Sequence, residues 1–233
     1  MTETDRYSRQ TMLAEIGPEG QERLRRASVL IIGVGGLGSA VATYLAAAGV
    51  GHLGLADPDV VSLSNLQRQV LYSEAEIGLP KTERAAARLG ALNSEVKITL
   101  HPEGITPENA DALAAQYDLV VDCCDNFATR YLIDDACARA GRTWIYGSIG
   151  EFHGQVAVFG PESGRRYTDL YPDRQALCSL PRRVAGVLGT VPGVVGAIQA
   201  TQAIELIAGF GQPLLGRLFT IDLKTLTTNT FTL

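Results

Sequence analysis

The chain has 233 residues, of which 46% are hydrophobic, and 20 basic against 25 acidic side chains give a net charge of −5. That hydrophobic fraction excludes a disordered protein, and a chain of this length buries a sizeable core. The acidic balance argues against a broad basic face, so we expect no nucleic-acid partner. It is still compatible with a small anion site lined by a few arginines.

The four cysteines, at positions 123, 124, 137 and 178, are too sparse for the disulfide framework of a small secreted protein. No Cys-x-x-Cys spacing occurs and the three histidines are scattered, so we expect no zinc site. The first residues are polar and acidic, without the apolar core of a signal peptide. We therefore expect a cytoplasmic protein in which Cys123 and Cys137 belong to the core.

Short apolar strands alternate with helices through the first two thirds of the chain. The β-branched run from Ser28 to Gly33 predicts the first strand, and the alanine-rich stretch that ends at Gly49 predicts the helix after it. The alternation is typical of a Rossmann-like α/β fold, a doubly wound, mainly parallel sheet with helices on both faces. We predict strands over 28–33, 52–57, 95–101, 118–123 and 143–149, and helices over 37–48, 81–92, 107–116 and 127–140.

The last third of the chain has a different rhythm. Strands predicted over 155–159, 217–223 and 228–233 have no alternating helices between all of them, which favours an antiparallel extension of the sheet. Residues 160–183 are polar and predict a long irregular loop, a kind that is usually functional or mobile. The uncharged stretch over 184–204 has only 12 apolar residues of 21, so we expect a glycine-rich turn and a buried helix and no membrane span.

We expect the chain to form one domain over residues 1–233. Residues 1–27 would supply N-terminal helices and residues 28–150 a nucleotide-binding core. Residues 151–233 would supply the antiparallel strands, the loop and a C-terminal helix.

Four glycines, Gly33, Gly35, Gly36 and Gly38, form a loop between the first predicted strand and its helix. Glycines let the backbone approach a phosphate closely, and the helix N-terminus adds a favourable dipole. Asp57 ends the next strand, where an acid accepts hydrogen bonds from a ribose hydroxyl. A tight strand–helix turn would use such glycines for its own geometry, so the pattern by itself indicates only a nucleotide.

Further polar residues follow the same strands and narrow the choice of nucleotide. Residues just past the carboxyl ends of parallel strands share one crevice. Cations in that crevice suit a triphosphate, and an acid beside them suits Mg²⁺. Taken singly, the arginines are typical of surface ion pairs, the lysine of a solvated first turn and Asp125 of a helix cap. The candidates are Asp59, Ser64, Asn65, Gln67, Arg68, Lys81, Asp125, Asn126 and Arg130.

Seven longer motifs, from Arg6 to about Leu223, match one family. They are RYSRQ at 6–10, GVGGLG at 33–38, AGVGHLGLADPDVVSLSNLQRQ at 48–69, GLPKTE at 78–83, DLVVDCCDNFATR at 118–130, GQVAVF at 154–159 and VVGAIQATQAIELIAG at 194–209. Through these motifs the chain resembles the bacterial ThiF/MoeB/HesA family of adenylyltransferases, which are related to ubiquitin-activating enzymes.

The resemblance implies an ATP- and Mg²⁺-dependent reaction. The C-terminal Gly-Gly carboxylate of a small ubiquitin-like sulfur carrier attacks the α-phosphate, which gives an acyl-adenylate and pyrophosphate. The carrier would serve thiamine, molybdopterin or related sulfur transfer. By motif match, Gly36 lies under the phosphates, Asp57 holds the ribose, Cys124 lies at the nucleotide and Asp125 holds Mg²⁺. The residues that would meet the triphosphate are Asn65, Arg68 and Lys81.

The resemblance also implies a homodimer, because the arginine that matches Arg9 reaches into the neighbouring subunit's site. Two departures from the family accompany it. The cysteine pairs that hold zinc in many relatives are missing, since the first would fall on 166–169 and the second beyond residue 233. A loop cysteine of many relatives is replaced by Arg182 and Arg183, which leaves Cys178 as a candidate for thioester or persulfide chemistry.

Three other functions remain open at this point. An NAD(P)-dependent oxidoreductase would share the glycine loop but has no use for Arg68, Lys81 and Asp125 together. A tRNA-base-adenylating dehydratase of the same superfamily would keep the chemistry, but the acidic balance and the lack of a basic tail count against it. An inactive subunit of a heterodimer would not need those three residues intact.

Overall fold

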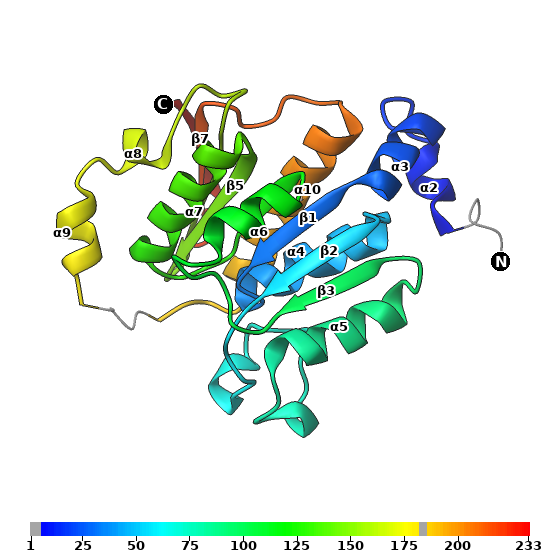
Figure 1. The fold of residues 1–233 in the computed structure, drawn as a ribbon, viewed down its shortest axis with the longest axis horizontal. Helices are drawn as coiled ribbons and strands as arrows, with labels where there is room; N and C mark the ends of the chain where they lie inside the picture. The colour runs from blue at the N-terminus through cyan, green and yellow to red at the C-terminus, as the bar shows by residue number, and fades with distance from the viewer. Residues whose placement is uncertain (1–5, 182–185) are drawn as a thin grey trace.

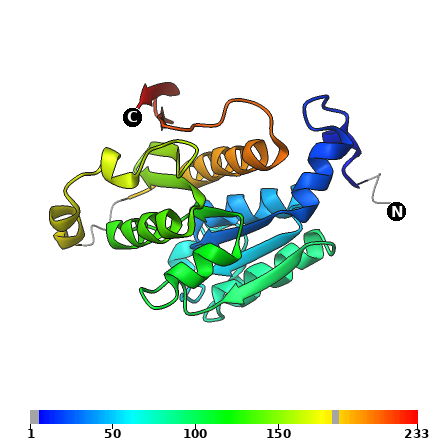
Figure 2. The same ribbon diagram turned by 45° about the horizontal axis from the view of Figure 1, so that its top comes forward.

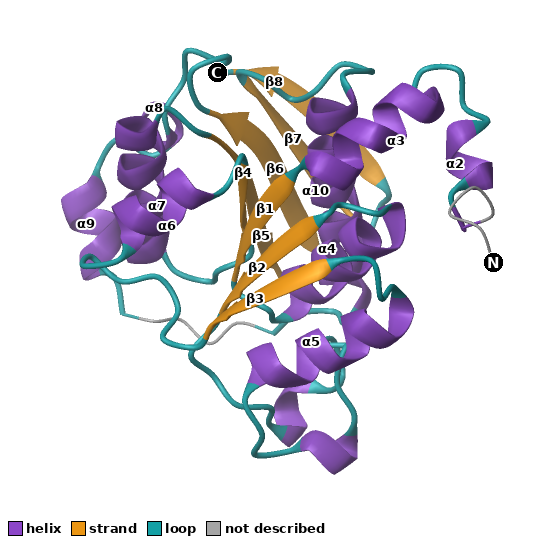
Figure 3. Cartoon of the chain, turned by 45° about the vertical axis from the view of Figure 1, so that its right-hand side comes forward, coloured by secondary structure: helices purple, strands orange, loops and turns teal. Residues whose placement is uncertain are grey.

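A computed structural model of the protein describes residues 6–181 and 186–233. Within this part of the chain, eight strands form one twisted sheet in the order β3-β2-β1-β4-β5-β6-β7-β8 (Figures 1 and 3). The strands are β1 Ser28–Ile32, β2 His52–Ala56, β3 Lys97–His101, β4 Leu119–Asp122, β5 Thr143–Gly150, β6 His153–Phe159, β7 Arg217–Asp222 and β8 Thr227–Thr232.

Helices cover both faces of the sheet (Figure 2). The described helices are α2 Ser8–Thr11, α3 Gly17–Arg26, α4 Gly36–Ala48, α5 Lys81–Leu92, α6 Ala110–Gln116, α7 Phe127–Ala140, α8 Tyr167–Leu170, α9 Arg174–Ser179 and α10 Thr190–Ala208. Alternate residues of β1 show the division: Val29 and Ile31 pack with α4, α5 and α10, whereas Leu30 and Ile32 pack with α6 and α7.

The pairing of the strands confirms the predicted fold class. Strands β1 to β5 are parallel, and β6, β7 and β8 extend the sheet in antiparallel fashion. Helices α5 and α7 begin and end at the predicted residues. Helix α6 starts at Ala110, three residues later than predicted, because the Asn109 side chain accepts a hydrogen bond from Thr106 N and closes a turn before the helix.

The expectation of an irregular loop over 160–183 is wrong for its described part, which contains α8 and α9. The Asp173 carboxylate accepts a hydrogen bond from Ala176 N, 3.0 Å away, and so caps α9. Helices of four and six residues are too short to give a periodic apolar pattern, which is why the sequence did not indicate them. Residues 182 and 183 lie outside the described part of the chain.

Helix α10 follows the glycine-rich turn, as predicted, and has Pro192 in its first turn, where a missing N–H costs little. By length and composition alone α10 could cross a membrane, but half of its most apolar stretch is buried within the protein. It packs against α4, α3 and strands β4, β5 and β6. We therefore describe α10 as a core helix. Cys123 and Cys137 are also buried, as expected.

Candidate nucleotide-binding site

The predicted site residues, apart from Arg9 and Cys178, follow the carboxyl ends of β1, β2 and β4. The chain leaves β1 toward β2 on one side and returns to β4 on the other, so the loops after β1 and β4 diverge and leave a crevice. Gly33 N donates a hydrogen bond to Ala56 O and Cys123 N donates one to Ile32 O, each with a donor–acceptor distance of 2.8 Å. These bonds hold the three strand ends side by side.

The glycine loop is shaped mainly by the fold. Gly33 has φ +91°, and a Cβ atom on Gly38 would overlap the Gly33 carbonyl oxygen, so both glycines are needed for the turn itself. A Cβ atom on Gly36 would lie 2.9 Å from Pro192 Cβ on α10. Only at Gly35 would a Cβ atom meet ordinary contact distances. Since α4 begins at Gly36, its first N–H groups and its dipole favour an anion in the crevice.

Asp57 fixes the course of this loop. Its Oδ2 accepts a hydrogen bond from Val34 N at 2.7 Å, and its Oδ1 accepts one from Asp59 N at 2.9 Å. Burial raises the pKa of Asp57, against the opposing effects of the Lys81 charge and the two N–H groups. The carboxylate thus bonds to two loops at once, and its expected contact with a ribose stays a prediction.

Lys81, the first residue of α5, is buried and bonded to the segment that follows β2. Its Nζ donates to Asp59 Oδ2 at 2.8 Å, and the lysine side chain is 5% exposed against 66% for Asp59. An exposed carboxylate is a weak partner in water, so a phosphate that reaches the lysine can compete with it.

The segment after β2 brings the next predicted residues to the loop. Arg68 Cγ lies 3.7 Å from the place that a Cβ of Gly36 would take, and the Arg68 guanidinium donates to Ser64 O at 3.0 Å. Asn65 Oδ1 accepts from Ser62 N at 3.3 Å, which closes a short 3₁₀ turn over Leu63–Asn65. Gln67 is exposed, and its backbone carbonyl faces Gly189, just before α10.

Arg130 is buried beneath the loop that follows β4. Its Nε lies 3.2 Å from Asp122 Oδ2, its Nη2 donates to Cys124 O and Gly147 O, and its guanidinium lies 5.3 Å from the Tyr146 ring centroid. Arg130 thus holds the strand-end loop in place. The charge of Arg130 is already balanced by Asp122. The expected contact of Arg130 with a nucleotide stays a prediction.

The loop itself carries Cys124, Asp125 and Asn126. Burial raises the pKa of the Cys124 thiol well above its ordinary value, so this thiol is not a ready nucleophile. The N-cap of α7 is Asn126, whose Oδ1 accepts from Thr129 N at 2.9 Å, and not Asp125. The Asp125 side chain is exposed, and the preceding residues, Cys123 and Cys124, lie with their main chain against Gly33. Mg²⁺ typically takes one or two protein carboxylates together with substrate phosphates, and this position fits that role.

Arg9 lies far from the glycine loop of its own chain. The ring of Tyr7 packs on Gly49, just past α4, and Gln10 Nε2 donates to Ala48 O at 3.1 Å. These contacts fix α2 at the C-terminal end of α4, whereas the glycine loop lies at its N-terminal end. A helix of 13 residues is roughly 20 Å long. The exposed Arg9 side chain therefore cannot complete the crevice of its own subunit.

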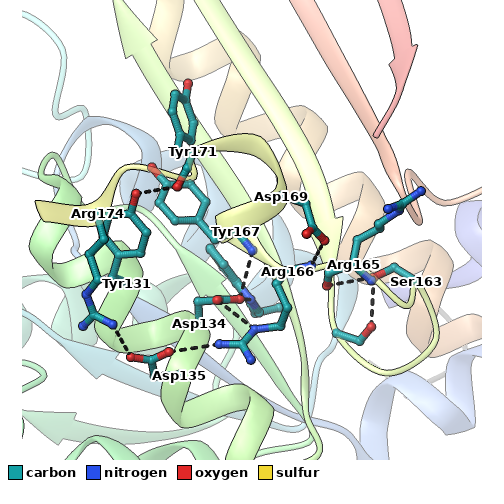
Figure 4. A network of polar contacts seen from close by, with 12 residues as sticks. Tyr131, Asp134, Asp135, Ser163, Arg165, Arg166, Tyr167, Asp169, Tyr171 and Arg174 are labelled. Carbon is teal, nitrogen blue, oxygen red and sulfur yellow. Dashed lines mark hydrogen bonds and ion pairs between the residues drawn. The ribbon is translucent and has the colours of Figure 1, made fainter. Parts of the chain in front are cut away.

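Cys178 also lies outside the crevice, on α9, where it is exposed. The segment around it, residues 160–181, is called the α7 strap below because side chains of α7 hold it (Figure 4). Arg166 bonds to Asp134 at 2.8 Å and to Asp135 at 2.9 Å. Tyr167 is fully buried against Tyr131 and Trp144. These contacts occupy 166–169, where the family resemblance would place a cysteine pair.

Tyr72 is a site residue that sequence reasoning missed. Its hydroxyl donates to Val34 O at 2.7 Å, in the middle of the glycine loop, and lies 3.4 Å from Lys81 O. The ring is buried, so the residue looks like an ordinary core aromatic in the sequence. Its position three residues after Gln69, in the segment rich in predicted site residues, was the available signal.

The fold and the crevice together define a nucleotide-binding α/β domain with a glycine loop at its topological switch point. A family model described as the ThiF family matches residues 7–233, and the chain belongs to this family. The family resemblance is thus confirmed, as is the expected class of enzyme, an adenylyltransferase.

Several curated proteins are close in sequence. The chain is 47% identical to the sulfur carrier protein adenylyltransferase of Thermus thermophilus, over 94% of this chain and 83% of that one. It is 44% identical to the probable adenylyltransferase/sulfurtransferase MoeZ of Mycobacterium tuberculosis, over 99% of this chain and 60% of MoeZ. For adenylyltransferase and sulfurtransferase MOCS3 of Mus musculus the identity is 46%, over 93% of this chain and 47% of MOCS3.

Solved structures of MccB from E. coli share the architecture. A structure described as MccB with ATP superposes with a TM-score of 0.84 and 26% identity, over 98% of this chain and 71% of that one. Another, described as MccB with MccA-N7isoASN, has a TM-score of 0.86 and 25% identity, over 97% of this chain and 72% of that one.

Proposed function

We propose that the protein adenylates the C-terminal carboxylate of a small sulfur-carrier protein that ends in Gly-Gly, with Mg·ATP as the second substrate. The observation that carries the proposal is the meeting of the glycine loop, the start of α4, Lys81 and Asp125 at one end of the sheet. A relative named sulfur carrier protein adenylyltransferase supports the carrier as substrate, and the MccB structure with ATP supports the nucleotide.

In this reaction a carboxylate oxygen of the tail attacks the α-phosphorus, and the bond from that phosphorus to the bridging oxygen of pyrophosphate breaks. The products are an acyl-adenylate and pyrophosphate. Positioning and charge neutralisation supply most of the acceleration in such transfers. Gly35, Gly36 and the first N–H groups of α4 would receive the phosphates. Mg²⁺, when bound at Asp125, would neutralise phosphate charge.

Lys81 and Arg68 are the cations that a triphosphate can recruit. Lys81 is held by Asp59, an exposed partner, so binding would replace a solvated carboxylate with a phosphate. Arg68 is half-buried beside Gly36 and, among the described residues, donates only to a backbone carbonyl, which leaves other guanidinium N–H groups for the ligand. The exchange of partners at Lys81 and the free N–H groups of Arg68 would both favour triphosphate binding without a large rearrangement.

ATP–pyrophosphate exchange with a panel of Gly-Gly-tailed carriers tests the proposal. We expect exchange with at least one carrier, and we expect Asp125→Ala to lower its rate by at least about a hundredfold because phosphate charge is no longer neutralised. Asp173→Ala is the matched control, because it removes an exposed acid that lies away from the crevice, on the α7 strap. This variant should retain exchange. If no carrier supports exchange while NAD(P) binds tightly, an oxidoreductase is the better assignment.

We infer further that the active form is a homodimer in which Arg9 enters the partner's crevice. Arg9 is exposed and lies at the wrong end of α4 for its own site. A mixture of Arg9→Ala and Asp125→Ala subunits should recover up to about a quarter of wild-type exchange, because one mixed arrangement holds both intact groups in one crevice. Exchange of subunits is checked first with a tagged chain. No recovery after subunit exchange would exclude a shared site.

Cys178 is a candidate for a covalent link with the carrier, which is tested separately from adenylation. If the Cys178 thiolate attacks the acyl-adenylate, a thioester to the carrier forms and AMP leaves as the acyl–oxygen bond breaks. Cys178→Ser should then keep ATP–pyrophosphate exchange and lose the covalent adduct, seen by mass spectrometry without reductant. Its exposure on α9 makes such a link sterically possible. An unchanged adduct in the variant would assign the link elsewhere.

A further inference from the structure

The side chain of Gln69 is buried beside the glycine loop with part of its hydrogen-bonding capacity unused. The residue is 4% exposed, and its Oε1 is buried without a hydrogen-bond partner. Its Nε2 is the nearest atom to the place that a Cβ of Gly35 would take, 3.4 Å away. The carboxamide therefore faces the one glycine of the loop that the fold itself does not require.

The backbone of Gln69 is firmly placed, so the unused oxygen is not the result of a loose segment. Gln69 N donates to Asn65 O at 2.9 Å, and Gln69 O accepts from Tyr72 N at 3.2 Å. The Tyr72 hydroxyl in turn donates to Val34 O in the glycine loop. The Oε1 atom is therefore an acceptor that no donor of the described residues reaches, on a carboxamide whose Nε2 lies beside Gly35.

Other buried glutamines of the described chain are satisfied. Gln199 Nε2 donates to Asp122 O at 2.7 Å. Gln202 Nε2 donates to Glu205 at 2.6 Å, and Gln202 Oε1 accepts from Leu214 N at 2.6 Å. A buried carboxamide oxygen without a partner is destabilising and uncommon in native proteins. The exception at Gln69, aimed at an anion-binding loop, indicates a group that gains its partners from a ligand.

We propose that Gln69 is a nucleotide-contacting residue whose Nε2–H donates to a phosphate oxygen held at Gly35 and Gly36. This inference rests on the proposed function in taking ATP as the ligand. A carboxamide suits the position because it donates to a phosphate without adding charge, and bonds to an ionised acceptor are the stronger ones. The ribose hydroxyls and ordered water of a bound nucleotide would supply donors for Oε1.

Gln69→Met tests the contact because it keeps the shape of the side chain and removes both polar atoms. We expect the Kd for ATP with Mg²⁺, measured by calorimetry without any carrier, to rise about ten- to a hundredfold, while the Kd for adenosine changes less than threefold. The melting temperature of the ligand-free variant should equal or exceed that of the wild type, because a buried unsatisfied atom has gone. Gln202→Met is the matched control: it should melt at a lower temperature and bind ATP as the wild type does.

The outcomes separate this inference from the proposed function. A wild-type protein that does not bind ATP overturns both. A wild type that binds ATP, with a Gln69→Met variant of the same Kd, overturns the inference alone. A variant that melts lower and loses ATP and adenosine affinity equally shows a purely structural role, which also overturns it. Should Gln69→Met fail to fold, Gln69→Glu serves: a carboxylate there should weaken ATP more than tenfold and spare adenosine, and equal affinity for ATP would refute the contact.

Discussion

The crevice at the strand ends and the α7 strap are both rich in polar contacts, but the contacts are of different kinds. In the crevice, the Lys81–Asp59 and Arg130–Asp122 pairs join side chains, but other bonds hold the main chain of the loops. They run from Asp57 to Val34 N, from Tyr72 to Val34 O and from Arg130 to Cys124 O. In the strap, ion pairs of Arg166 and Arg174 with the acids of α7 attach the segment through side chains. A change in the crevice therefore alters the course of ligand-binding loops, whereas a change in the strap alters only how that segment is attached.

The largest expected effect comes from breaking the buried pair under the crevice. Arg130→Met leaves Asp122, which is fully buried, without its cation. We expect the free energy of unfolding to fall by about 3–5 kcal/mol, because an uncompensated charge stays in the interior. The same change frees the Cys124 and Gly147 carbonyls, so ATP affinity should fall as well. Denaturant titration and calorimetry measure the two effects.

The control for this prediction is the double variant with Asp122→Leu and Arg130→Met. Replacing both partners with apolar groups removes the unpaired charge, so most of the stability should return. ATP affinity should stay low, because the Cys124 carbonyl still lacks its donor. A double variant that recovered both properties would show that Arg130 does not shape the loop.

A smaller effect is expected in the strap. Arg166→Met removes the cation from Asp134, whereas Asp135 keeps its pair with Arg174. Asp134 also keeps hydrogen bonds from Tyr167 N and Trp144 Nε1. The Arg166 side chain is 42% exposed, so solvent screens the pair. We expect a loss of about 1–2 kcal/mol, or roughly 2–8 °C in melting temperature, with an unchanged Kd for ATP. A tenfold loss of ATP affinity would show that the strap and the crevice are coupled.

The same difference explains what the sequence could and could not predict. The parallel sheet, the glycine loop and the helix after Pro80 follow from local periodicity and turn chemistry, and these predictions hold. The partner of Arg166 lies 32 residues away and that of Tyr72 lies 38 residues away, so both depend on how distant segments pack. The exposed position of Asp125 and the distance of Arg9 from its own loop likewise appear only in three dimensions.

The smallest expected effect is a pH dependence of the stability lost in Asp57→Asn, the variant of the carboxylate that fixes the glycine loop. Burial raises the pKa of Asp57 above the unfolded value of about 3.9, so the folded state binds this proton more tightly than the unfolded chain does. Ionisation of Asp57 therefore costs stability as the pH rises through the raised pKa, and that cost is absent below about pH 4. Asp57→Asn is less stable than the wild type because Nδ2 cannot accept an N–H, but its deficit should narrow from pH 4 to pH 7.

Asp222→Asn gives the opposite sign and serves as the control. The Asp222 carboxylate accepts a hydrogen bond from Lys224 N, which lowers its pKa, so its contribution to stability is present at neutral pH and is lost as the pH falls through the lowered value. The deficit of this variant should therefore widen as the pH rises from about 2 to about 5 and stay nearly constant above that. Thermal melts of both variants from about pH 2 to about pH 7 measure the two deficits. If the two deficits change in the same direction with pH, burial does not raise the pKa of Asp57 in the folded protein.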